Sequence, residues 1–221
     1  ASCELKTTEA ADAATKSLLA IAHGADTDAA VAATSALGNI PTAAARTAIR
    51  GLITSPDPRI ASAALWSIDT VDDELLGKLE AIVQSGNMQI SNAALAALGH
   101  AGDAALPVLH EVSLHGAMQL RGQAVNAIGM IGGPEAIKTL GEILDEDDRL
   151  SARAAAAVLA NLGGPDAREL LIESALSDRA QLRGALGQLQ QMAGEDVDQA
   201  LLSVVRQGSS ADRRAALPRL L

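Results

Sequence analysis

The histidines and their acidic neighbours are the residues of this chain whose spacing can be tested most directly for chemistry. His110 and His115 lie five residues apart beside Glu111, whereas two histidines that bind a metal from one helix face lie four residues apart. The other two histidines, His23 and His100, belong to no such cluster. We therefore predict ordinary surface histidines and no metal site.

A run of four acidic residues extends from Asp145 to Asp148. It lacks the alternating ligands and the closing glutamate of a calcium-binding loop, so we predict a solvated turn before a helix, whose dipole the negative charge stabilises. The chain contains no nucleophile with an adjacent base, no paired carboxylates and no phosphate-binding loop. We therefore predict that the protein is not an enzyme and needs no cofactor.

Cys3 is the only cysteine, which excludes an internal disulfide. The chain lacks an initiating methionine, so we expect a cleaved precursor or a fragment, either cytoplasmic or exported. Ala1-Ser2-Cys3 resembles the end of a bacterial lipoprotein signal, in which Cys3 would carry a lipid anchor. The alternative interpretation is a free thiol in a frayed terminus.

The composition restricts the class of protein and of partner. Apolar residues make up 48% of the chain, but Phe and Tyr are absent and Trp66 is the only aromatic residue. Such a core of small aliphatic side chains suits helices in close contact. The net charge of -10 opposes nucleic acid as a partner. No apolar run approaches the ~20 residues that cross a bilayer, so we predict a soluble chain without a membrane span.

An internal repeat organises the whole chain. Aliphatic residues that we call anchors recur every 30 or 31 residues, at Leu37, Ile68, Leu98, Ile128, Leu159, Leu189 and Leu220. An alanine stands four residues before every anchor, at Ala33, Ala64, Ala94, Ala124, Ala155, Ala185 and Ala216. Residues four apart are neighbours on a helix, so each anchor marks a helix, which we call a B helix. Three residues before the anchors, the buried stripe continues through positions such as Leu65 and Leu217.

A second helix, the A helix, precedes each B helix. The turns that lead into the A helices contain glycine and often proline, as in Gly132-Gly133-Pro134, where glycine caps one helix and proline starts the next. A unit of about 30 residues with two helices cannot bury its apolar face alone, so neighbouring units must stack. We predict one all-α solenoid domain of about seven helix pairs over residues 1–221. Because the chain ends within the seventh B helix, we expect that the protein continues or that its end packs on something else.

The stretch from Leu120-Arg121 to Gly133-Pro134-Glu135-Ala136-Ile137 resembles the short HEAT-like repeats of phycobilisome lyases. This resemblance covers nearly the whole chain and implies a right-handed α-solenoid, an α-α superhelix, whose B helices line the concave side. Deoxyhypusine hydroxylase, an iron enzyme on a HEAT-like fold, has His-Glu pairs in several repeats. Here His110-Glu111 is the only such pair, which leaves too few ligands for a diiron site.

The outer positions of the B helices, two residues before and two after the anchors, point away from the predicted core. From them we predict a partner-binding site formed by Trp66, His100, Asn126 and Met130, flanked by Asn39, Asn161 and Gln191. Trp66 offers a large apolar area and one N–H donor, as binding anchors do. The alternative is that Trp66 only covers small side chains of the adjacent repeat.

The leading interpretation is a non-catalytic scaffold that binds a partner protein on the concave face. The alternative, implied by the resemblance to phycobilin lyases, is a helper enzyme or chaperone that holds a tetrapyrrole or a client protein in the groove. HEAT-like DNA glycosylases provide a third comparison, but they need a basic groove. The acidic charge of this chain opposes that function.

Overall fold

The computed structural model describes residues 2–146, 148–176, 183–208 and 210–220, without the side chains of 2–8, 183, 184, 210, 211, 219 and 220. The described residues form fourteen α-helices and one short 3-10 helix, and no strand. The prediction of an all-α chain of seven helix pairs is thereby confirmed. None of the described helices combines the length and the apolar character that a bilayer span requires.

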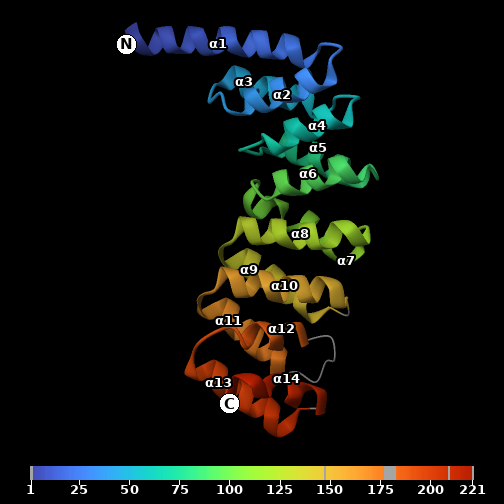
Figure 1. The fold of residues 1–221 in the computed structure, drawn as a ribbon, viewed down its shortest axis with the longest axis vertical. Helices are drawn as coiled ribbons and strands as arrows, with labels where there is room; N and C mark the ends of the chain where they lie inside the picture. The colour runs from blue at the N-terminus through green and yellow to red at the C-terminus, as the bar shows by residue number, and fades with distance from the viewer. Residues whose placement is uncertain (1, 147, 177–182, 209, 221) are drawn as a thin grey trace. The chain divides into compact units, whose positions relative to one another are not determined.

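The chain divides into two compact units, Ala1–Ala101 and Gly102–Leu221. The prediction of one domain over residues 1–221 stays a prediction. In the first unit, the B helices α2, α4 and α6 stack in order, with α4 packed on both neighbours (Figure 1). The A helices of this unit are α1, α3 and α5. The bounds of the six helices are α1 Ser2–Ala22, α2 Thr27–Gly38, α3 Ala43–Leu52, α4 Pro58–Trp66, α5 Asp73–Gln84 and α6 Met88–Leu98.

The second unit repeats this arrangement with four helix pairs after the 3-10 helix η1. Its B helices α8, α10, α12 and α14 pack in sequence, and its A helices α7, α9, α11 and α13 form a second row (Figure 1). The bounds are η1 Gly102–Ala105, α7 Leu106–His115, α8 Met118–Ile131, α9 Gly133–Asp145, α10 Arg149–Leu162, α11 Gly164–Leu176, α12 Arg183–Leu189, α13 Glu195–Gln207 and α14 Ser210–Leu220.

The repeated alanines and anchors form the core of both units. All seven alanines of the repeat are buried, and so are the six anchors from Leu37 to Leu189, whereas the side chain of Leu220 lies outside the described part. A small side chain at the alanine position lets adjacent helices approach closely, and the larger anchor one turn later fills the space between them. The register read from the sequence is therefore correct.

Leu217 departs from the predicted buried stripe. It lies three residues before the last anchor, where Leu65 and Leu95 are buried, but its side chain is 38% exposed. Helix α14 packs on α12 and α13, and no described helix follows it. The expectation that Leu217 is buried was wrong because burial at this position depends on a following helix.

The B helices begin with a side-chain cap at a fixed place, eleven residues before the anchor. Asp26, Asp57, Asn87 and Asp148 occupy this place and accept hydrogen bonds from backbone N–H groups of the first turn. Such caps contribute about 1 kcal/mol each to helix stability. Ala117, at the start of α8, provides no such bond. There Arg121 Nε instead donates to the carbonyl of Gly116.

Glycine terminates two B helices of the second unit, as the turn motifs predict. Gly132 and Gly163 follow α8 and α10 with φ values of 64° and 66°, in the left-handed region that other residues avoid. The next A helices start at once, with Pro134 in the first turn of α9. A pyrrolidine ring is tolerated there because the first N–H groups of a helix have no partner within it. These turns reverse the chain between the two rows of helices.

Candidate binding surface

Trp66 is the most conspicuous outer side chain of the first unit. It is the last residue of α4, and its side chain is 64% exposed. The equivalent positions on the stacked helices α2 and α6 are Ser35 and Ala96, whose small side chains leave the indole uncovered. The indole N–H has no hydrogen-bond acceptor among the described residues. Trp66 therefore presents an apolar ring with an unused donor.

Asn39 and His100 occupy the outer positions that follow the anchors of α2 and α6. Both are exposed. The amide nitrogen of Asn39 donates to the carbonyl of Ser35 at 3.2 Å, which holds this side chain against the end of its own helix. The first unit thus places an amide, an indole and an imidazole at the C-terminal ends of three consecutive B helices.

The other four predicted residues lie in the second unit. Asn126 and Met130 belong to α8, Asn161 to α10, and Gln191 follows the end of α12. All four are exposed, and the side chain of Met130 is 53% exposed. The seven residues are therefore outward-facing as the repeat register predicts, three in one unit and four in the other. That these seven residues form one binding surface stays a prediction.

The histidines differ in environment. His23, His100 and His115 are exposed, whereas His110 is half-buried and its Nε2 has no hydrogen-bond partner within the described part of the chain. In that part, no three His, Cys, Asp or Glu side chains are grouped so that they could hold a metal ion. Cys3 lies in α1, but its side chain is outside the described part, so the lipid-anchor interpretation is untested.

The acidic run before α10 provides a helix cap. Asp148 accepts a hydrogen bond from Ser151 N at 3.3 Å and forms an ion pair with Arg121 Nη1 at 3.2 Å. Partial burial raises the pKa of Asp148, but the bonds from Ser151 and Arg121 outweigh it and lower this pKa below its usual value. Ser151 Oγ also donates to the carbonyl of Ser113 at 2.5 Å. Asp148 thus connects α10 with α8. Another residue of the acidic run, Asp147, lies outside the described residues.

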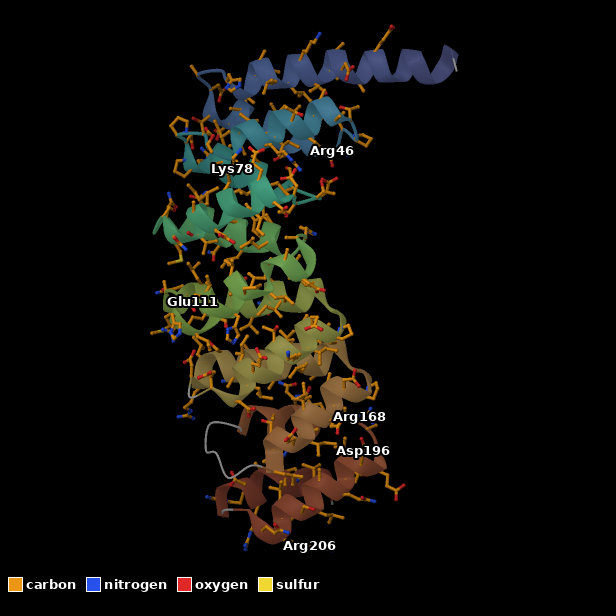
Figure 2. The ribbon with its side chains drawn as sticks, turned by 180° about the vertical axis from the view of Figure 1, so that it is seen from behind. Arg46, Lys78, Glu111, Arg168, Asp196 and Arg206 are labelled. Atoms are coloured by element: carbon orange, nitrogen blue, oxygen red, sulfur yellow. The ribbon has the colours of Figure 1, made fainter. Side chains whose placement is uncertain are left out.

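Two hollows lie between A helices of the second unit. The first, of ≈ 310 Å³, lies beside the contact of α7 with α9 and is lined by Asp103, Leu106, Pro107, His110, Glu135, Thr139 and Glu142. The second, of ≈ 560 Å³, lies between α11 and α13, where Arg168 and Asp196 lie side by side (Figure 2). Their ion pair measures 3.3 Å. Neither hollow contains a predicted site residue, because all seven predicted residues lie on B helices or directly after them. The sequence contains one signal for the first hollow, the spacing of Glu135, Thr139 and Glu142. These residues lie four and three positions apart and therefore share one face of a helix.

The stacked helix pairs define the class of this protein as an α-solenoid. The family model for HEAT repeats matches residues 76–160 and again 117–188, which together exceed half of the chain. The chain therefore belongs to the HEAT-repeat family. No curated protein is significantly similar to it in sequence.

Several solved structures share the fold. The CpcE–CpcF complex of phycocyanin lyase from Nostoc sp. PCC7120 is similar with a TM-score of 0.53 and 18% identity, over 94% of each chain. Human deoxyhypusine hydroxylase in complex with glycerol is similar with a TM-score of 0.43 and 15% identity, over 97% of each chain. A designed armadillo repeat protein in complex with the peptide (KR)4 gives 0.46 and 18%, over 93% of this chain and 98% of the design. At these identities the likeness concerns the fold alone.

Proposed function

We propose that this chain is a non-catalytic scaffold that binds a partner protein through the outer positions of its B helices. The observation that carries the proposal is the 64% exposure of Trp66 in a chain that has no other aromatic residue. An indole left in water gains free energy when a partner covers it, and aromatic anchors of this kind dominate many protein interfaces. Trp66 is thus the proposed centre of binding in the first unit.

The surrounding outer positions suit the main chain of a protein partner. Asn39, Asn126, Asn161 and Gln191 carry carboxamides, each of which can donate and accept hydrogen bonds. A peptide group offers the same pair of functions, one donor and one acceptor per residue. Uncharged amides also cost less to desolvate than charged groups do. Together with Trp66, Met130 and His100, these amides form the proposed partner-binding set.

Tryptophan fluorescence provides a direct test, because Trp66 is the only tryptophan. Proteins retained from a cell extract by the immobilised wild-type chain, but not by a Trp66→Ala variant, are purified and titrated against the free chain. We expect the emission of Trp66 to move to shorter wavelength and its quenching by acrylamide to decrease as the partner covers the ring.

Leu202→Ala is the matched control, since Leu202 is an apolar residue of the A helix α13 that is 41% exposed and does not belong to the proposed set. This variant should retain the same proteins as the wild type. A partner that binds the Trp66→Ala variant and the wild type equally, without changing the emission of Trp66, would contradict the proposal.

The second candidate is a helper function of the phycobilin-lyase kind. It is favoured by the fold shared with the phycocyanin lyase complex. Titration with phycocyanobilin tests it: a shifted absorbance band with saturable binding would support it, and an unchanged spectrum would exclude a held tetrapyrrole.

A further inference from the structure

Charge in the second unit is divided between the two rows of helices. The B helices α8, α10 and α12 contain arginines but no acidic residue, with Arg121 in α8, Arg149 and Arg153 in α10, and Arg183 in α12. The A helices carry most of the acidic residues, for example Glu135 and Glu142 in α9 and three carboxylates in the first turn of α13. Although the net charge of the chain is -10, the helices α8, α10 and α12 therefore carry no negative side chain.

Arg149 and Arg153 of α10 are two arginines of this row that are accessible to a partner. Both are exposed, and neither forms an ion pair or a hydrogen bond with a described residue. Arg121 of α8 differs, since it is paired with Asp148. Arg149 and Arg153 are four residues apart, so their guanidinium groups lie on one side of α10.

Apolar side chains accompany these arginines at the start of the stacked helices α8 and α10. Met118 is 68% exposed and Leu150 is 46% exposed. Exposed apolar groups of this size beside charged ones are typical of sites that bind another protein. Asp148 lies next to Arg149 in sequence, but its carboxylate is already held by Arg121 and Ser151. No ion pair joins Arg149 to another described residue.

We infer that Arg149, Arg153, Leu150 and Met118, here called the arginine surface, bind an acidic segment of a partner protein that also carries apolar side chains. The inference rests on the proposed function, for which it specifies the partner's chemistry at the second unit. A guanidinium binds a carboxylate through two parallel hydrogen bonds, and the two apolar side chains cover aliphatic groups of the same segment. Nucleic acid is the weaker candidate, since polyanion binding needs many clustered cations and the chain as a whole repels polyanions.

The probe for this surface is a fluorescein-labelled peptide in which Gly-Glu-Leu-Glu repeats, and its binding is followed by fluorescence anisotropy at low salt. The matched peptide has Gln in place of each Glu. We expect the acidic peptide to bind, the Gln peptide to bind at least tenfold more weakly, and the double variant Arg149→Gln and Arg153→Gln to lose about tenfold in affinity. Two exposed charge pairs of up to about 1 kcal/mol each give a change of that size.

The control double variant is Arg46→Gln with Arg206→Gln, which removes the same charge from the A helices α3 and α13 (Figure 2). It should bind the acidic peptide like the wild type. Equal losses of affinity in both double variants would overturn the inference, because the overall charge of the chain, and not the arginine surface, would then determine peptide binding. A Gln peptide that binds as tightly as the acidic one would also overturn it. So would an oligothymidylate that binds more tightly than the acidic peptide.

Trp66→Ala separates this inference from the proposed function. Trp66 belongs to the first unit, so the variant should bind the acidic peptide with unchanged affinity. If the purified partner binds Trp66→Ala as tightly as the wild type, while the peptides bind as expected, the proposed centre at Trp66 fails and the arginine surface stands. If the peptide does not bind while the partner depends on Trp66, the arginine surface fails alone.

Discussion

Gly129 and Val158 approach each other so closely that a methyl group on Gly129 would overlap Cγ1 of the valine. Gly129 follows the anchor of α8, and Val158 precedes the anchor of α10. The same relationship recurs in the first unit, where a Cβ on Gly38 would lie 2.7 Å from Cβ of Ser67. The glycine after the anchor therefore permits the contact between consecutive B helices.

Gly129→Ala is predicted to destabilise the second unit. Overpacking of this kind commonly costs about 1 to 3 kcal/mol, against which the better helix propensity of alanine returns less than about 1 kcal/mol. Denaturant unfolding measures the change. Val158→Ala in the same chain should restore part of the stability, because it removes the overlapping methyl group.

Gly122→Ala is the control for that experiment, since nothing lies within 4 Å of a Cβ at this position of the same helix. We expect it to stabilise α8 by roughly 0.5 to 1 kcal/mol. If Gly129→Ala were as stabilising as Gly122→Ala, the close contact between α8 and α10 would be wrong.

Ala124→Leu tests the buried alanine of the repeat. Ala124 is fully buried, so the larger side chain should strain the contact with neighbouring helices and cost about 1 to 3 kcal/mol. Gln123→Leu on the exposed side of α8 should change the free energy of unfolding by less than about 0.5 kcal/mol. An unchanged denaturation midpoint for Ala124→Leu would contradict the register.

Asp148 should make the stability of the second unit dependent on pH. Its pKa is lowered in the folded state, so its carboxylate contributes stability above the pKa of an unfolded aspartate, about 3.9. That contribution is lost as the pH falls through the lower folded pKa. Asp148→Asn keeps a capping oxygen but removes the charge, so it should cost about 1 kcal/mol at pH 7 and much less near pH 2. Urea unfolding at both pH values measures this; an equal difference at both would exclude the charge as its cause.

Trp66→Ala should weaken binding of a purified partner by roughly thirtyfold, whereas Gln191→Ala should have a much smaller effect. The melting temperature of the Trp66→Ala variant should barely change, since most of the Trp66 ring is exposed. Calorimetric titration and melting curves of both variants provide the comparison. Lost stability with intact affinity would show that Trp66 serves packing.

The chain is predicted to bind no transition metal in stoichiometric amount and to have no intrinsic hydrolytic activity. The physical reason is the spacing of its histidines, which places no two of them four apart on one helix. Elemental analysis of protein purified without chelator should show well below one iron or zinc per chain. One bound ion per chain would overturn the prediction.

The sequence by itself determined the helices, their number and their buried faces. Ala33, Leu37 and their equivalents recur at helical spacing and at a constant period, and these two periods leave few other ways to bury the apolar residues. The exposure of the outer residues followed from the same register, because a helix that buries one face must turn the opposite face outward. Trp66 and Met130 are examples.

Only the tertiary structure decided features that depend on what a residue meets in another repeat. Leu217 fits the buried stripe but is exposed because no described helix covers it. The contact of Gly129 with Val158 joins residues 29 positions apart whose distance no local pattern encodes. The same holds for charge: the value of -10 describes the whole chain, whereas the packing of α8 on α10 places two helices without an acidic residue next to each other. Periodicity fixes which face of each helix is buried, but the partner of each face depends on how the helices pack.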